Sequence, residues 1–126
     1  GNEKGGKFEF ANANPLWRAS LDIIDFMPLL SVDYGGGIII TDWYGEENEN
    51  DQIKITIQFL SNEVRSDALN IKVFKKKCTN LSNCKVIQSQ SDINQELRVA
   101  ILKRAAQYIS DDIEKNKKEY RIKDLN

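Results

Sequence analysis

The residues with the clearest chemical potential are two cysteines, Cys78 and Cys84, and the chain has no others. Five residues separate them, which is not the CxxC spacing of redox-active pairs, and neither stands at a helix start. Two cysteines that flank one turn can approach to disulfide distance. We therefore predict a disulfide between them, and a disulfide favours an oxidising compartment. Two free cytosolic thiols are the alternative.

Histidine is absent from the chain, and this limits the catalytic and metal-binding mechanisms that the chain could use. Its absence excludes Ser-His, Cys-His and His-metal mechanisms, and two cysteines cannot supply the usual four zinc ligands. Carboxylates near the expected turns remain, but their spacing fixes no catalytic pair, so we predict caps and solvated side chains, no enzyme activity and no cofactor. These carboxylates are Asp22, Asp25, Asp33 and Asp42. Three arginines in apolar stretches, Arg18, Arg65 and Arg98, are expected to pair with Asp22, Asp67 or Asp42.

Two loops resemble ligand sites but are better explained as turns. The glycine-rich run Asp33–Gly37 precedes a strand, whereas phosphate loops follow a strand and open a helix. The acidic run Glu46–Asp51 lacks the ligand spacing and central glycine of a calcium loop. We therefore expect a tight turn at the first run and a solvated hairpin loop at the second.

Length and charge place the chain among single globular domains. It has 126 residues and a formal net charge of −1, with 40% hydrophobic and 29% charged residues. This balance gives no reason to expect nucleic acid as a partner. No apolar run approaches the ~20 residues of a membrane span. We divide the chain into a flexible arm (1–13), one α+β domain (14–113) and a polar extension (114–126).

Two helices are expected, one at each end of the domain. Asn14 followed by Pro15 predicts a capped helix start, with Pro28 as the stop. Ser91 or Asp92 caps a second, long helix whose packed part ends near Ile113.

The middle of the chain predicts antiparallel strands, because the connecting loops are short and polar. We place them at Ile38–Tyr44, Gln52–Ser61, Asp67–Lys76 and, more briefly, Lys85–Ser89. Alternating apolar residues give the sheet one inward face. The predicted fold is an α+β two-layer sandwich: an antiparallel sheet of three or four strands with both helices against one face, similar to helix-grip domains. That inward face carries Ile53, Ile55, Ile57, Leu69, Ile71 and Val73.

Several runs resemble a known family. They are Leu16–Leu21, Phe26–Leu29, Thr41–Tyr44, Val64–Leu69 and the helix around Ala100–Ala105, with Asp33, Gly35 and Gly36 between them. Together they are similar to an alphaproteobacterial domain-of-unknown-function family of envelope lipoproteins, over roughly 15–109. Ser66 stands where the family carries alanine, and the cysteine loop is not part of its pattern. The resemblance implies a signal peptide and a lipid-bearing cysteine upstream of Gly1, a membrane tether, and no known activity.

We expect a periplasmic or outer-membrane-associated module that binds another envelope protein. A carrier of a small apolar ligand and, less favoured, a carboxylate-based enzyme are the alternatives. The expected partner surface is the sheet face opposite the helices, if Trp43 points outward to join Leu60 and Phe74 there. The register of the first strand leaves that orientation open. Two alternatives remain for this face: the arm covers it through Phe8 or Phe10, or its apolar residues are simply scattered and exposed.

Overall fold

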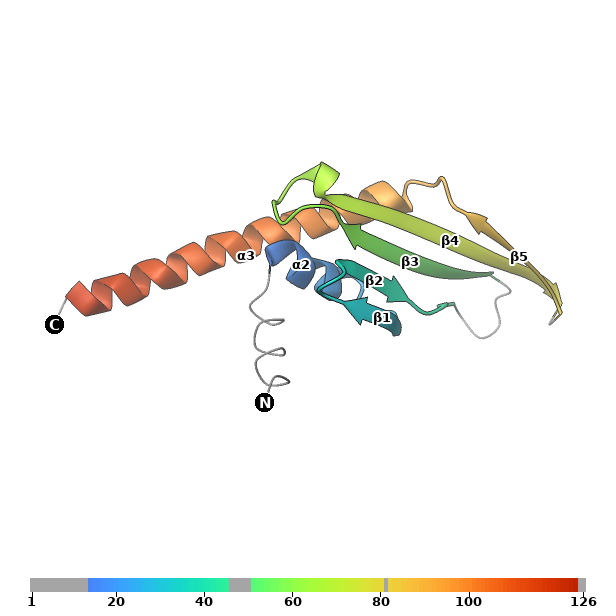
Figure 1. The fold of residues 1–126 in the computed structure, drawn as a ribbon, viewed down its shortest axis with the longest axis horizontal. Helices are drawn as coiled ribbons and strands as arrows, with labels where there is room; N and C mark the ends of the chain where they lie inside the picture. Colours follow the sequence, from blue (N-terminus) through green and yellow to red (C-terminus); the bar gives the residue numbers. More distant parts are fainter. Residues whose placement is uncertain (1–13, 46–50, 81, 125–126) are drawn as a thin grey trace.

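The computed structural model describes residues 14–45, 51–80 and 82–124 and shows a sheet with helices on one side (Figure 1). The five-stranded antiparallel sheet has the order β1-β2-β3-β4-β5, so every strand pairs with its neighbour in sequence. The elements are α2 (Pro15–Ile23), β1 (Leu29–Asp33), β2 (Ile38–Thr41), β3 (Asp51–Phe59), the 3-10 turn η1 (Ser66–Ala68), β4 (Leu69–Asn80), β5 (Asn83–Gln88) and α3 (Ile93–Asp124).

The predicted inward face of the sheet is the face that packs against the helices. Ile55 lies opposite Val73 and Ile57 opposite Ile71, and all four side chains are buried. They form one core with side chains of both helices, Ile101 of α3 among them. The α+β class and the placement of both helices are therefore confirmed. We call this side of the sheet the inner face.

Helix α2 begins where the sequence predicts. The Asn14 side chain accepts a hydrogen bond from the Leu16 amide at 2.7 Å, which satisfies one of the free N–H groups of the first turn. The helix ends at Ile23, however, well before Pro28. Proline only forbids continuation, and the chain turns away earlier, so the predicted stop was too late.

The sheet has five strands, where we predicted three or four. The additional strand, β1, is an exposed edge strand with a register irregularity between Leu29 and Ser31. Its residues show no clean apolar alternation, and the strand was therefore not predicted. It pairs with β2 through the turn Asp33–Gly37. That turn forms as predicted: Asp33 accepts from the Gly36 amide at 2.9 Å, and Gly37 takes the φ of +66° that glycine tolerates.

One extra residue interrupts the pairing of β2 with β3. Ile40 lies opposite Thr56, whereas Tyr44 lies opposite Ile53, so four steps along one chain match three along the other. Such a bulge reverses the alternation of side chains beyond it. The predicted regular strand Ile38–Tyr44 is therefore wrong, and β2 ends at Thr41. Beside the bulge, the Thr41 hydroxyl satisfies the buried Ile55 amide by accepting its hydrogen bond at 2.9 Å.

Two clusters of polar contacts attach α3 to the body. Arg98 donates to the backbone oxygens of Ser66 and, at 2.6 Å, of Leu69. Arg104 and Tyr108 both donate to the carboxylate of Asp22 on α2. Beyond these contacts Figure 1 shows the helix running past the sheet toward its C-terminal end. It continues to Asp124, through the segment 114–124 that we assigned to a polar extension.

Candidate functional site

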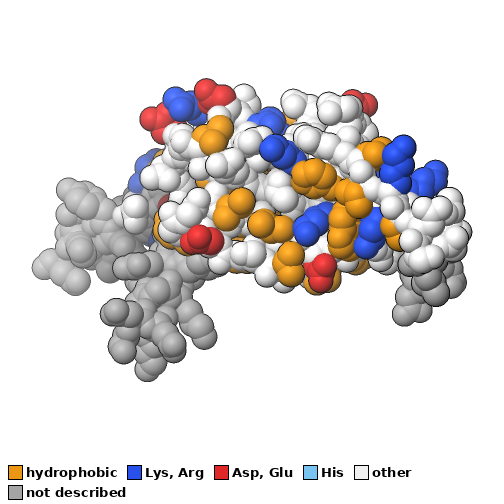
Figure 2. Space-filling model, turned by 45° about the vertical axis from the view of Figure 1, so that its right-hand side comes forward, with side chains coloured by type: hydrophobic (Ala, Val, Ile, Leu, Met, Phe, Trp, Pro, Cys, Tyr) orange, Lys and Arg blue, Asp and Glu red, His pale blue; other side chains and the backbone are white. Residues whose placement is uncertain are grey.

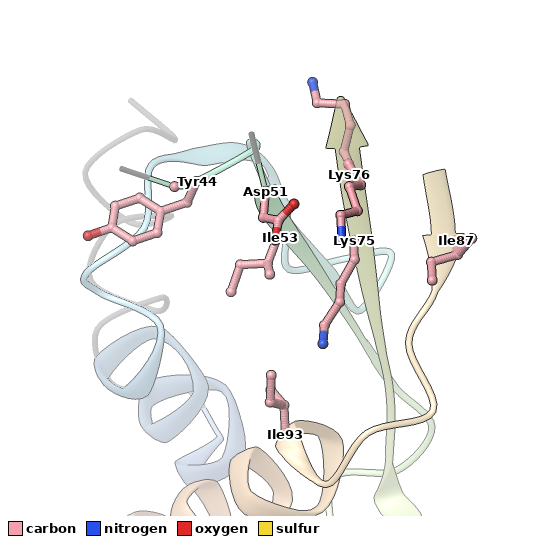
Figure 3. Close-up of a pocket in the computed structure, with 9 residues that line it drawn as sticks. Tyr44, Asp51, Ile53, Lys75, Lys76, Ile87 and Ile93 are labelled. Atoms are coloured by element: carbon pink, nitrogen blue, oxygen red, sulfur yellow. The ribbon is translucent and has the colours of Figure 1, made fainter. Parts of the chain in front are cut away.

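The helices cover only one end of the inner face. Helix α3 begins at Ile93, while β3, β4 and β5 extend beyond it, as Figure 1 shows. The uncovered end forms an open groove of about 590 Å³ (Figure 3). We call it the distal groove. Its lining residues are Tyr44, Gly45, Asp51, Ile53, Lys75, Lys76, Lys77, Ile87 and Ile93.

Lys75 occupies the middle of the groove. It lies directly opposite Ile53 on β3 and Ile87 on β5, so a lysine stands between two isoleucines on one face. Figure 3 shows its side chain running into the groove between them, while Lys76 points the other way. Lys75 is half-buried, and no carboxylate among the described residues lies within ion-pair distance of it. An ammonium group among apolar side chains is a natural partner for an anionic group on an otherwise apolar ligand.

Positive charge gathers along this end of the sheet. Lys77 lies opposite Lys85 across β4 and β5, on the same face as Lys75. Asp51, opposite Lys77, is the one carboxylate that lines the groove among the described residues. In a chain with a formal net charge of −1, this is a local concentration of cations. Figure 2 shows basic side chains (Lys and Arg, blue) beside hydrophobic ones (orange) at the corresponding end of the molecule.

Exposed aromatic rings form a second apolar cluster beside the groove. The bulge after Thr41 turns Tyr44 to the inner face, where its ring meets that of Phe26 edge-on, with centroids 5.5 Å apart. Phe26 is 54% exposed and Tyr44 43% exposed, although rings of this size normally contribute to a core. The apolar surface of the groove therefore continues toward the end of α2.

The predicted partner residues do not form one patch. Trp43 lies on the outer face, because Lys54 and Lys76 place their ammonium groups 5.6 and 4.7 Å from its ring centroid. Phe74 is on that face too, directly opposite Lys54. Leu60, although 61% exposed, follows the other end of β3, roughly 20 Å away at ~3.3 Å per residue.

Trp43 reaches the outer face through the bulge, which was not predicted from the sequence. Ile39 and Thr41 point inward, and only the bulge turns Trp43 outward. Phe8 and Phe10, the alternative occupants of this face, lie outside the described residues.

The structure contains the predicted disulfide between Cys78 and Cys84. The two residues face each other across β4 and β5, with α-carbons 4.0 Å apart. They lie inside the strands rather than at the ends of a loop. The predicted end of the third strand at Lys76 was therefore too early, and the hairpin turns only between Asn80 and Asn83.

Three of the four aspartates that the sequence offered as acid–base candidates accept structural hydrogen bonds. Asp33 caps its turn and Asp42 accepts from the Trp43 amide at 2.8 Å. The bond that Tyr108 donates to Asp22 raises the pKa of the tyrosine hydroxyl, because it stabilises the protonated form. The acidic run Glu46–Asp51, for which we expected a solvated hairpin loop and no calcium site, lies outside the described residues apart from Asp51.

Only one of the arginines pairs as predicted. Arg65 contacts Asp67 at 3.0 Å. Arg18 instead reaches Asp112 of α3 at 3.6 Å, and Arg98, itself on α3, donates to the backbone oxygens of Ser66 and Leu69. Within the described ranges, no group of three Cys, Asp or Glu side chains is placed to hold a metal ion. No helix in the same ranges is both long and apolar enough to cross a membrane.

The distal groove was not predicted from the sequence, although one signal for it was present. Leu69, Ile71 and Val73 alternate inward along β4, and Lys75 is the next residue on that face. A lysine that continues an apolar alternation marks the point at which the core ends. How far the helices cover the sheet cannot be read from this pattern.

Comparison with known proteins gives a family without an assigned activity. Residues 10–110 match the family model described as "Domain of unknown function (DUF3576)". The chain is also 45% identical over 62 residues to "Uncharacterized protein RP420" of Rickettsia prowazekii (strain Madrid E), a match that covers 48% of this chain and 37% of that protein. No solved structure matches the chain. Because the family model covers most of the chain, the protein belongs to the DUF3576 family.

Proposed function

We propose that this protein is a non-catalytic binding domain of the bacterial cell envelope that holds a segment of another envelope protein in the distal groove. The observation that carries the proposal is Lys75, half-buried between Ile53 and Ile87 with no carboxylate beside it in the described residues. Exposed apolar groups around a cation that no described carboxylate pairs with suit a partner segment that combines apolar side chains with a carboxylate.

Two observations support an extracytoplasmic location. Disulfides persist mainly in oxidising compartments, and Cys78 and Cys84 are bonded. The relative in Rickettsia fits an alphaproteobacterial family, and the resemblance noted in the sequence implies that such a family belongs to the envelope. We extend the proposal to a periplasmic or outer-membrane-associated domain that is tethered through a lipidated cysteine upstream of Gly1.

Site-specific photo-crosslinking in the native envelope tests the proposal. A benzophenone side chain replaces Ile87, which is 52% exposed in the groove, or Ile113, which is 49% exposed on α3. The two isoleucines match in type and exposure but are separated by at least the ~30 Å rise of α3 between Ile93 and Ile113. We expect a discrete protein adduct from position 87 that position 113 does not give.

Charge reversal supplies the second arm of that experiment. Lys75→Glu is expected to abolish the adduct from position 87, whereas Lys103→Glu, on the exposed side of α3, leaves it unchanged. Identical adducts from both crosslinker positions, or an adduct indifferent to Lys75→Glu, would contradict a specific groove.

The groove volume favours a second candidate, a carrier of a small amphiphilic anion. About 590 Å³ lies within the range of small-ligand pockets, and Lys75 suits a single carboxylate or phosphate there. Native mass spectrometry of the protein released from its envelope distinguishes the two functions. A bound mass of a few hundred daltons that disappears in Ile53→Trp, which fills the groove, would favour the carrier.

A further inference from the structure

The free edge of β5, beside the distal groove, offers a row of backbone groups to a partner. Within the described residues β5 is the last strand of the sheet, and each of its six residues is exposed. Ser89 donates its amide to the Val73 oxygen at 2.7 Å, which places the pair in a hydrogen-bonded position of the ladder. Such positions alternate along antiparallel strands. The backbone groups of Val86 and Gln88 therefore point away from β4, toward the free edge.

This edge has few of the features that normally prevent strand pairing. Edge strands are usually protected by proline, bulges or several charges. The middle of β5 instead carries adjacent apolar residues, Val86 and Ile87, each 52% exposed, with Lys85 as its one charged residue. The disulfide ties the far end of the strand to β4. The register irregularity of the β4–β5 pair lies near the turn, between Cys78 and Asn80, and leaves the pairing of the apolar middle of β5 regular. Such an edge is suited to accept a further strand.

Charge indicates which strand would fit. An added strand beside β5 would place alternate side chains on the inner face, next to Lys85 and near Lys75 and Lys77. On the outer face it would lie near Lys76, which pairs with Val86. A second copy of β5 would bring two such lysine groups together, so charge disfavours self-pairing. An acidic segment would meet attraction on both faces.

We propose that β5 binds an extended polypeptide segment in which acidic and apolar residues alternate, added as a sixth strand that continues into the distal groove. The inference rests on the proposed function and specifies its partner chemistry. Backbone hydrogen bonds to Val86 and Gln88 supply affinity, and the lysines select for acidic side chains. An anionic lipid surface would satisfy the lysines but could not pair with the strand edge.

Proline substitution tests the edge without touching the groove. Val86→Pro removes an amide that faces the free edge, so the pairing of β4 with β5 keeps its hydrogen bonds. Val86→Thr is the matched control, because it retains the amide and a β-branched side chain. The probe is a capped seven-residue peptide that alternates glutamate and valine, compared with its lysine counterpart. Binding is followed by fluorescence anisotropy and by amide shifts in NMR spectra.

The expected result is binding of the glutamate probe alone, with shifts at the amides of Val86 and Gln88. Val86→Pro should weaken it at least about tenfold, the effect of losing one or two hydrogen bonds, and Val86→Thr by less than about twofold. If Val86→Pro loses the native circular dichroism spectrum, Gln88→Pro makes the same test at the neighbouring edge amide.

Equal binding by the proline and threonine variants would overturn strand addition. So would failure of the glutamate probe together with binding to phosphatidylglycerol vesicles that Val86→Pro does not alter. Either result leaves the proposed function standing if the adducts from position 87 persist. If the glutamate probe binds at the edge but position 87 gives no adduct, the proposed groove function is refuted while strand addition at β5 stands.

Discussion

The contact between Thr41 and Ile55 predicts a large effect from a small substitution. Thr41→Val exchanges a hydroxyl for a methyl group and leaves the side-chain shape almost unchanged. The hydroxyl accepts the Ile55 amide at 2.9 Å, and both side chains are buried, at 0% and 1% exposure. Valine therefore leaves a buried amide without an acceptor, which costs about 1–3 kcal/mol of unfolding free energy.

The corresponding change in melting temperature follows from the size of the domain. An unfolding entropy of ~2.1 cal/mol/K per residue gives roughly 0.2 kcal/mol/K for ~100 packed residues. A loss of about 2 kcal/mol thus lowers the melting temperature by about 10 °C. Urea unfolding followed by tryptophan fluorescence measures the free energy, and hydrogen exchange measures protection of the Ile55 amide.

The control variant is Thr41→Ser, which keeps the hydroxyl and loses only a methyl group. It should cost about 1 kcal/mol and preserve slow exchange at Ile55, because the hydrogen bond survives. Thr41→Val should accelerate that exchange. A valine variant within about 0.5 kcal/mol of the parent, with Ile55 still protected, would refute the role given to the hydroxyl at the bulge.

Three further predictions concern the contacts that hold the elements together. Because the bond to Asp22 raises the pKa of Tyr108 above its unfolded value, its stabilisation is complete below pH ~10 and is lost as pH rises through the folded pKa. Stability between pH 9 and 12 should therefore fall less steeply in Tyr108→Phe than in the parent, as urea midpoints can show. Replacing Cys78 and Cys84 by serine should cost about 2 kcal/mol by the chain-entropy model, and adding reductant should then shift the urea midpoint of the parent alone. Arg98→Leu should cost about 1–2 kcal/mol, because two backbone oxygens lose their donor, while Arg98→Lys recovers part of the loss in the same assay.

The parts of the fold that were predictable share a strong local pattern. Alternation along β3 identified the inner face, and Asn14 with Pro15 identified the start of α2. Each signal comes from neighbouring residues whose preferences agree with the final structure.

The parts that were missed depend on distant residues. The edge strand β1 exists because β2 offers it a partner, and its own residues show no alternation. The bulge after Thr41 depends on how many residues the chain uses to return to β3. The distal groove depends on where α3 begins against the sheet, and no short window of sequence contains both the start of α3 and the strand ends that it leaves uncovered.

The length of α3 makes the contact with α2 the pivot of a lever. Among the described polar contacts between the two helices, the one nearest the helix end is that of Arg18 with Asp112, about 18 Å before Asp124 at 1.5 Å per residue. A tilt of about 10° at this point would move the end of the helix by about 3 Å, by the same rise per residue. Small rearrangements among these polar side chains would thus become displacements that a spin label near the helix end can resolve. A change at the contact with α2 would thus be read as a change of position far from the body of the domain.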